Sequence, residues 1–162
     1  MMDKRAYAAS NSCLPIASLA AIQAWPREPR VNEIIHAMSA RLVLAIAAIM
    51  GALAVAAGAF GAHALKSRVG PELIAVWQTA VLYQAMHALA LLAVGLLLMM
   101  KGDSAVLRLA AWLFIAGIVL FSGSLYALAL GGSRLLGPVT PIGGVAMIAG
   151  WLTFAWAAWR MP

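Results

Sequence analysis

Four long uncharged stretches follow Arg41, and they constrain the fold more than any other feature of the chain. Short polar segments separate the stretches, which cover residues 42–62, 73–100, 109–133 and 135–159. Each one reaches the roughly 20 residues that an α-helix needs to cross the hydrocarbon core of a bilayer. The sequence therefore predicts an all-α membrane protein with four transmembrane helices.

Composition agrees with a chain whose solvent is lipid. Of the 162 residues, 65% are hydrophobic and only 10% are charged, against about 25% charged in ordinary soluble domains. The formal net charge is +6, but the basic residues are scattered at the ends of the spans and do not gather on one face. That distribution argues against nucleic acid as a partner. It favours membrane lipid, because Lys and Arg at span ends meet anionic headgroups.

Residues 1–37 differ from the rest and are treated as an N-terminal extension to a transmembrane domain at 38–162. Their apolar patch at 13–25 is too short to span a bilayer and contains Pro15. Three interpretations stay open: a weak imitation of a signal peptide, a disordered or loosely membrane-associated tail, or a true start of translation at Met38. The third is favoured, because Met38 stands directly before the first span. The one cysteine, Cys13, excludes an internal disulfide.

Proline, glycine and tryptophan suggest where the helices begin and end. Gly70-Pro71-Glu72 predicts a helix start with proline at the first helical position, and Thr140 followed by Pro141 predicts another. Trp77 is interpreted as an anchor at the membrane interface. The predicted spans cover about residues 42–63, 76–100, 108–131 and 141–159.

Short connections predict an up-down four-helix bundle. The N-terminus, the 101–108 connection and the C-terminus then share one side of the membrane. That side has a slight excess of Lys and Arg over the side with Lys66, Arg68 and Arg134. The positive-inside rule predicts a cytoplasmic N-terminus and C-terminus for a protein of the bacterial inner (plasma) membrane.

Small residues recur along the spans at the spacing that lets helices approach closely. Candidate packing positions are Gly51, Gly58, Ala62, Gly117, Gly123 and Gly150. Two uses stay open: packing within the bundle, which is favoured, and contact with a second copy or a larger membrane complex.

Polar side chains concentrate in the second span, at the end of the third and near the connections on the same side. We expect them to approach each other around a polar pocket floored by Gln84 and His87, which share a helix face. The candidate pocket residues are His63, Gln78, Tyr83, Gln84, His87, Ser122, Ser124, Tyr126 and Thr140. A static network of hydrogen bonds between helices is the favoured alternative, because such bonds are common in membrane bundles.

The sequence lacks the residues that a catalytic, metal or cofactor site needs. After Arg41 the carboxylates are Glu72 and Asp103, which are predicted on opposite sides of the membrane. His63 and His87 are expected at different depths, which disfavours a haem held by both. No Ser-His-Asp or Cys-His set is present in the spans. We therefore predict no catalytic residues, no metal and no cofactor, and a protein that is not an enzyme.

Four ordered segments carry a resemblance to a known family: residues 58–66, 77–92, 120–126 and 137–144. Together they resemble the small four-helix bacterial inner-membrane proteins typified by YgdD and YwdK, which are classed as a domain of unknown function. The resemblance covers roughly residues 38–159. It implies a four-span plasma-membrane protein that begins just before its first span, and it brings no catalytic residues.

Two functions stay open at this point. The favoured one is a non-enzymatic structural or accessory membrane component that packs against partner helices or itself. The alternative is a small-molecule or lipid-binding protein, or a minimal transporter, that uses the polar pocket near Gln84 and His87.

Overall fold

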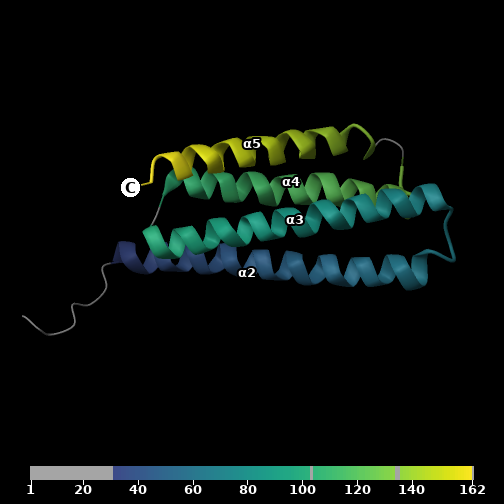
Figure 1. Ribbon diagram of the computed structural model, residues 1–162, viewed down its shortest axis with the longest axis horizontal. Coiled ribbons are helices and arrows are strands. Elements are labelled where there is room, and N and C mark those ends of the chain that lie inside the picture. Colours follow the sequence, from purple (N-terminus) through teal and green to yellow (C-terminus); the bar gives the residue numbers. More distant parts are fainter. Residues whose placement is uncertain (1–30, 103, 134–135, 162) are drawn as a thin grey trace, which may run out of the picture.

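The computed structural model describes residues 31–102, 104–133 and 136–161, with side chains from Ala40 onward, and its described part is helical without strands (Figure 1). The helices are α2 (Val31–Phe60), which continues into the π-helical turn η1 (Gly61–Leu65), α3 (Pro71–Lys101), α4 (Ala105–Ala129) and α5 (Val139–Trp159). All four long helices are long and apolar enough to cross a membrane. The predicted all-α, four-span architecture is confirmed.

The helices alternate in direction and lie side by side in chain order (Figure 1). Extensive contacts join α2 to α3, α3 to α4 and α4 to α5, and no comparable contact joins α2 to α5. In the most apolar part of each helix, 44% of α3 and 39% of α4 is buried, against 11% of α2 and 22% of α5. The up-down arrangement is therefore open, with α3 and α4 at its centre and α2 and α5 at its edges.

The N-terminal extension is only partly within the described residues. Residues 1–30 lie outside them, whereas residues 31–37 belong to α2, which passes through Met38 without a break. The physical reason is the lack of a helix breaker, because no proline or glycine occurs between Pro29 and Gly51. The predicted boundary at residue 38 is therefore not an element boundary.

The two predicted helix starts behave differently. α3 begins as expected, with Gly70 as its N-cap and Pro71 in its first turn. α5 begins earlier than expected, because Pro138 occupies the N-cap and Val139 is the first helical residue. Thr140 therefore lies inside the helix, and its hydroxyl pairs with a side chain of α4 and does not cap α5.

The core consists of two apolar clusters with polar residues between them. The large cluster lies toward the α3–α4 connection and contains Leu91, Leu107 and Phe114, all fully buried. The small cluster lies toward η1 and is formed by Leu65, Trp77 and Ala129. Along α3, the buried side chains of Gln84 and His87 come between residue 77 of one cluster and residue 91 of the other.

Trp77 is a core residue, which corrects its interpretation as an interfacial anchor. Its side chain is 6% exposed, and its indole Nε1–H donates a hydrogen bond to the Ala57 carbonyl oxygen at 2.8 Å. The ring lies against Phe60 and Tyr126, with centroid distances of 5.5 and 4.5 Å. A Cβ at Gly61 would come within 2.6 Å of the indole. The glycine of the π-helical turn therefore makes the space that the tryptophan fills.

Glycines set the closest approach between helices at several places. Gly117 and Gly150 lie in the α4–α5 contact, against Met147 and Phe114 respectively, and Gly58 packs on Val81. By contrast, a Cβ at Gly51 or Gly123 would meet nothing within 4 Å, and Ala62 is exposed. These three predicted packing positions are not in close helix–helix contact within the chain. Gly51 of α2 and Ala62 of η1 border open space beside α3, and Gly123 lies on an exposed side of α4.

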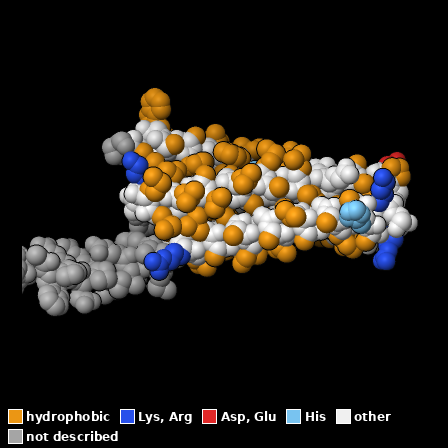
Figure 2. Space-filling view, turned by 60° about the horizontal axis from the view of Figure 1, so that its bottom comes forward, with side chains coloured by type: hydrophobic (Ala, Val, Ile, Leu, Met, Phe, Trp, Pro, Cys, Tyr) orange, Lys and Arg blue, Asp and Glu red, His pale blue; other side chains and the backbone are white. Residues whose placement is uncertain are grey.

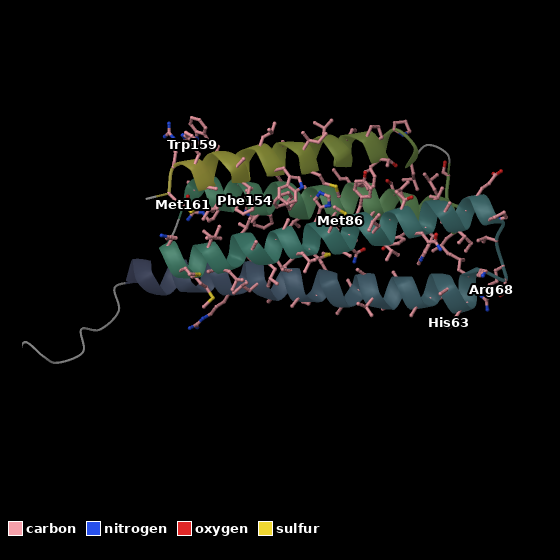
Figure 3. All side chains as sticks on the ribbon, in the orientation of Figure 1. His63, Arg68, Met86, Phe154, Trp159 and Met161 are labelled. Carbon is pink, nitrogen blue, oxygen red and sulfur yellow. The ribbon has the colours of Figure 1, made fainter. Side chains whose placement is uncertain are left out.

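Charge is confined to the two ends of the array on the face shown in Figure 2, and a broad hydrophobic belt lies between them. One end carries the described basic residues Arg41, Lys101, Arg108 and Arg160. The Arg160 guanidinium stacks on the Trp156 ring at 4.3 Å. His63 and Arg68 lie together at the other end (Figure 3). Charged ends and an apolar belt match the two interfaces and the core of a bilayer.

Candidate functional site

Polar side chains in the middle of α3 and α4 join neighbouring helices through main-chain carbonyl groups. The Gln84 Nε2 donates to the Met50 carbonyl oxygen at 2.9 Å, which ties α3 to α2. The Ser122 hydroxyl donates to the Ala80 carbonyl oxygen at 2.9 Å, which ties α4 to α3. With His87, these buried residues form a layer between the apolar clusters, and we call Gln84, His87 and Ser122 the polar layer.

His87 links α3 to α5 and uses both of its ring nitrogens. Nδ1 lies 2.8 Å from the Tyr83 carbonyl oxygen, which only accepts hydrogen bonds, so Nδ1 carries the proton. The Trp151 Nε1–H donates to Nε2 at 3.2 Å, so Nε2 carries the lone pair. The ring is surrounded by aromatic residues, with Phe114 at 5.8 Å and Tyr83 at 5.9 Å between centroids. Both nitrogens of the neutral imidazole are thus satisfied within the chain.

This geometry predicts the Nδ1–H tautomer for neutral His87. In ¹⁵N spectra of selectively labelled protein at neutral pH, we expect Nδ1 to show the shift of a protonated nitrogen and Nε2 that of an unprotonated one. Trp151→Phe removes the donor to Nε2 and should move only the Nε2 resonance. The Nε2–H tautomer in the unaltered protein would contradict the hydrogen bonds described here.

The remaining polar residues of α4 and α5 form a second group nearer to the α4–α5 connection. Ser124 Oγ donates to the Phe121 carbonyl oxygen at 2.9 Å and lies 2.8 Å from Thr140 Oγ1. Since the serine proton is used on the carbonyl, the threonine is the donor in the pair. Tyr126 packs on Trp77, and its buried Oη has no hydrogen-bond partner among the described residues.

Three of the predicted pocket residues are exposed, and one of them, Tyr83, contacts His87 of the polar layer through its carbonyl oxygen and its ring. His63 is exposed in η1 at the end of the array, beside the α2–α3 connection (Figure 3). Gln78 is exposed on α3. Tyr83 is partly exposed, and its ring contacts that of Phe121 at 4.6 Å between centroids. The nine candidate residues therefore belong to separate contacts at different depths and do not surround one cavity.

The chemistry available to these groups is hydrogen bonding between helices. Among residues 31–102, 104–133 and 136–161, no three His, Cys, Asp or Glu side chains gather where they could hold a metal ion. Gln84 and Ser122 donate to carbonyl oxygens of neighbouring helices, and His87 donates to Tyr83 of its own helix and accepts from a tryptophan of α5. Such bonds typically stabilise a membrane bundle by about 0.6 kcal/mol each, and up to about 2.

A groove runs along the uncovered side of the α2–α3 pair. Its part beside the middle of α2 encloses about 390 Å³ and its part beside η1 about 280 Å³, and Ala85 borders both. The part beside the middle of α2 is wholly apolar and is lined by Ala48, Gly51, Val55 and Leu89, among others. The part beside η1 reaches Gly58, Gly61 and Gln78. This α2/α3 groove brings Gly51, Gly58, Ala62 and Gln78 of the predicted residues onto one surface.

Several residues that shape the site were not predicted. Trp151 supplies the donor to His87, and Gly61, Gly95 and Gly143 make room for side chains or backbone of the neighbouring helix. A tryptophan in the middle of the fourth stretch, away from either interface, was the available signal for Trp151, since the indole N–H needs a partner in lipid. The glycines gave no signal beyond their residue type, because their neighbours come from other helices.

The chain is similar to known membrane proteins over most of its length. Residues 57–144 match the family described as "Protein of unknown function (DUF423)". The inner membrane protein YgdD of Escherichia coli, named UPF0382, is 45% identical over 125 residues, which are 76% of this chain and 94% of that protein. The membrane protein YwdK of Bacillus subtilis is 42% identical over 118 residues, 73% of this chain and 96% of the relative.

A membrane protein of Staphylococcus aureus that is also named UPF0382 is 40% identical over 121 residues, which are 74% of this chain and 97% of that protein. No solved structure is significantly similar to the chain. The matched region of the family includes the π-helical turn, the polar layer and the start of α5. The chain therefore belongs to the DUF423 family, also named UPF0382, and is a multi-pass protein of the bacterial inner (plasma) membrane with four transmembrane helices.

Proposed function

We propose that the protein is a non-enzymatic structural or accessory component of the membrane, and that it acts by packing α2 against a second copy of itself. The observation that carries this proposal is the poor coverage of α2, which lies at an edge of the array with 11% of its most apolar part buried. The polar layer supports a non-enzymatic role, because its donors are used to hold neighbouring helices together.

The uncovered faces of the two edge helices differ in residue size. The exposed face of α5 is built of large side chains, including Ile142, Ile148 and Leu152. The exposed surface of α2 also carries large side chains, among them Ile49, Leu53 and Val55, but a continuous ridge of small ones runs between them, at Ala45, Ala48, Ala52, Ala56 and Ala59. Large apolar side chains suit contact with lipid, whereas small ones let two helices approach closely. The difference favours α2 over α5 as the helix that meets a partner.

The ridge and the α2/α3 groove lie next to each other, which suits a symmetric contact. A twofold dimer uses the same patch on both copies, so the patch must be complementary to itself. A ridge on α2 of one copy can enter the groove beside α2 of the other. Because Gly51 faces open space in the groove, no side chain there blocks the approach.

Disulfide cross-linking in native membranes tests this contact. In a Cys13→Ser background, Ala52→Cys places a thiol on the exposed face of α2, and Ile148→Cys is the matched control at similar depth on α5. We expect mild oxidation to give a dimer band with Ala52→Cys and not with Ile148→Cys. Equal yields from both positions, or none from either, would contradict the proposed role of α2.

The alternative function, a small-molecule or lipid-binding pocket floored by Gln84 and His87, has less support. Within the chain, Gln84 Nε2 already donates to Met50 and His87 Nδ1 to Tyr83, and His87 Nε2 already accepts from Trp151. A ligand there would have to replace these bonds. The proposed contact between α2 and a second copy leaves these hydrogen bonds in place, and we therefore favour the accessory role.

A further inference from the structure

Gln78 is a polar residue in an otherwise apolar part of the α2/α3 groove. It is exposed on α3 and lines the part beside η1, where the other lining residues are glycine, alanine or large apolar residues such as Trp77 and Leu82. No hydrogen bond of its side chain is found within residues 31–102, 104–133 and 136–161. Its neighbour Thr79, by contrast, donates to the Ala75 carbonyl oxygen of its own helix at 2.9 Å. The two N–H donors of the Gln78 amide are therefore available to a partner outside the chain.

The position of Gln78 along α3 makes such a partner favourable. Glu72 lies in the first turn of α3, at the end of the array that carries His63 and Arg68 (Figure 3). Gln78 is six residues further on, which is about 9 Å along the helix. It thus belongs to the apolar belt, past the charged end. Hydrocarbon offers no hydrogen-bond partner to an amide, so an unpaired amide there costs free energy, and glutamine side chains in membranes bond to other helices.

α2 already accepts hydrogen bonds from side chains of α3 through its main chain. The Gln84 Nε2 donates to the Met50 carbonyl oxygen at 2.9 Å, and the Trp77 Nε1–H donates to the Ala57 carbonyl oxygen at 2.8 Å. A helical carbonyl oxygen can accept such a second bond because it has two lone pairs. The alanines of the ridge leave the main chain of α2 accessible on its exposed surface, because a methyl side chain covers little of the backbone. That surface thus offers acceptors to a donor of a second copy.

The same two bonds show which level of α2 corresponds to Gln78. α2 and α3 are antiparallel, so each step forward along α3 is one step back along α2 (Figure 1). Position 84 is level with position 50, and position 77 with position 57, so Gln78 is level with Ala56. Ala56 is exposed and belongs to the ridge. Two copies inserted in the same orientation are related by an axis along the membrane normal, which keeps equivalent residues at equal depth. Gln78 of one copy is then at the depth of Ala56 in the other.

We propose that Gln78 determines the register of the contact between two copies: its amide donates to the main-chain carbonyl oxygen of Ala56 in the second copy, as Gln84 does to Met50 within the chain. This inference rests on the α2 contact proposed above. Twofold symmetry gives two such bonds per dimer, and the two copies are parallel. The amide also disfavours lipid as the occupant of this part of the groove, since acyl chains offer no acceptor.

Dimerisation of the full chain in phosphatidylcholine vesicles tests the proposal. Chains that carry donor or acceptor fluorophores at the C-terminus are mixed, and energy transfer across a dilution series gives the dissociation constant of the dimer. We expect Gln78→Met, which keeps an unbranched side chain of similar length, to raise this constant about eightfold, or about 1.2 kcal/mol. That is the effect of losing two hydrogen bonds of average strength between transmembrane helices. The matched control is Thr79→Val, whose hydroxyl is bonded within its own helix, and it should change the constant by less than about twofold.

Cross-linking between different copies tests the register. In a Cys13→Ser background, chains with Gln78→Cys are mixed with chains with Ala56→Cys, and the two kinds of chain carry tags of different size. With a thiol-specific cross-linker about as long as a glutamine side chain, we expect a mixed dimer. We expect none when Ala45→Cys replaces Ala56→Cys, because position 45 lies on the same ridge about three turns away.

The outcomes separate this inference from the proposed function. An unaltered protein that stays monomeric overturns both. A dimer that Gln78→Met leaves unchanged, or that Gln78→Met and Thr79→Val weaken equally, overturns the role of Gln78 and leaves the α2 contact in place. A mixed dimer through position 45 and not through position 56 overturns the register, and with it the bond to Ala56.

Discussion

Trp77→Ala is expected to lower the free energy of unfolding by about 3–5 kcal/mol, the cost typical of deleting a buried tryptophan. The indole is buried, fills the space above Gly61 and contacts both Phe60 and Tyr126. Its removal leaves a cavity in the small cluster and takes away the hydrogen bond to Ala57. Unfolding of the purified protein in mixed detergent micelles, followed by circular dichroism, measures the loss.

Two further variants separate the causes of that loss. Trp77→Phe keeps an aromatic ring and removes the hydrogen bond to Ala57, so it should cost about 1 kcal/mol for the bond, in addition to a smaller packing loss. Trp159→Ala removes a tryptophan that is 87% exposed, and should change the stability by less than about 0.5 kcal/mol. A Trp77→Ala protein as stable as the Trp159→Ala protein would refute the buried position of Trp77.

Gly143→Ala is expected to weaken the contact between α4 and α5. A Cβ at this position would meet the backbone nitrogen of Phe121, with its Cα at 2.8 Å, so the helices must move apart. Backbone cannot rotate aside as a flexible side chain can. Overpacking of this kind costs about 1–3 kcal/mol. Gly117 faces Gly143 from α4, where a Cβ would lie 3.2 Å from the Gly143 carbonyl oxygen, so this close approach depends on glycine in both helices.

Gly144→Ala provides the matched control on the next residue. A Cβ there would lie 3.8 Å from the Phe121 ring, which is an ordinary contact. Both substitutions gain helix propensity of up to about 1 kcal/mol, so the difference in stability between the two variants reports the steric cost at Gly143. We expect Gly143→Ala to be less stable than Gly144→Ala by about 1–3 kcal/mol in the same micelle assay. Equal stabilities would show that α4 and α5 do not approach closely at this point.

The number, type and direction of the helices could be predicted because lipid leaves few choices. A long apolar stretch in a bilayer must satisfy its backbone within the helix, and short connections then force neighbours to be antiparallel. The start of α3 was predicted correctly from one local signal, the proline at position 71. They failed by two residues at α5, because both Pro138 and Pro141 are compatible with a helix start and only one can be chosen from the sequence.

Contacts between helices were harder to predict. Short connections bring consecutive helices together, but they do not decide whether α2 and α5 pack on each other, and these two helices share no extensive contact. The polar residues of the second and third spans were recognised as a group, yet their partners were not, since Gln84 and Ser122 bond to carbonyl oxygens of Met50 and Ala80. Residue type does not show which main-chain carbonyl group accepts a hydrogen bond, because every residue has one.

The same choice of acceptors affects how freely the chain can change. Every residue has a carbonyl group, so replacing Met50, Ala57 or Ala80 leaves the oxygen that receives the hydrogen bond in place. The hydrogen bonds between α2, α3 and α4 therefore depend on the side chains of their donors, Gln84, Trp77 and Ser122, and not on the side-chain type of their acceptors. Ala80 must still stay small, because it is fully buried. A designer could rewrite the outer surface of α2 for a new binding partner while its attachment to α3 stays intact.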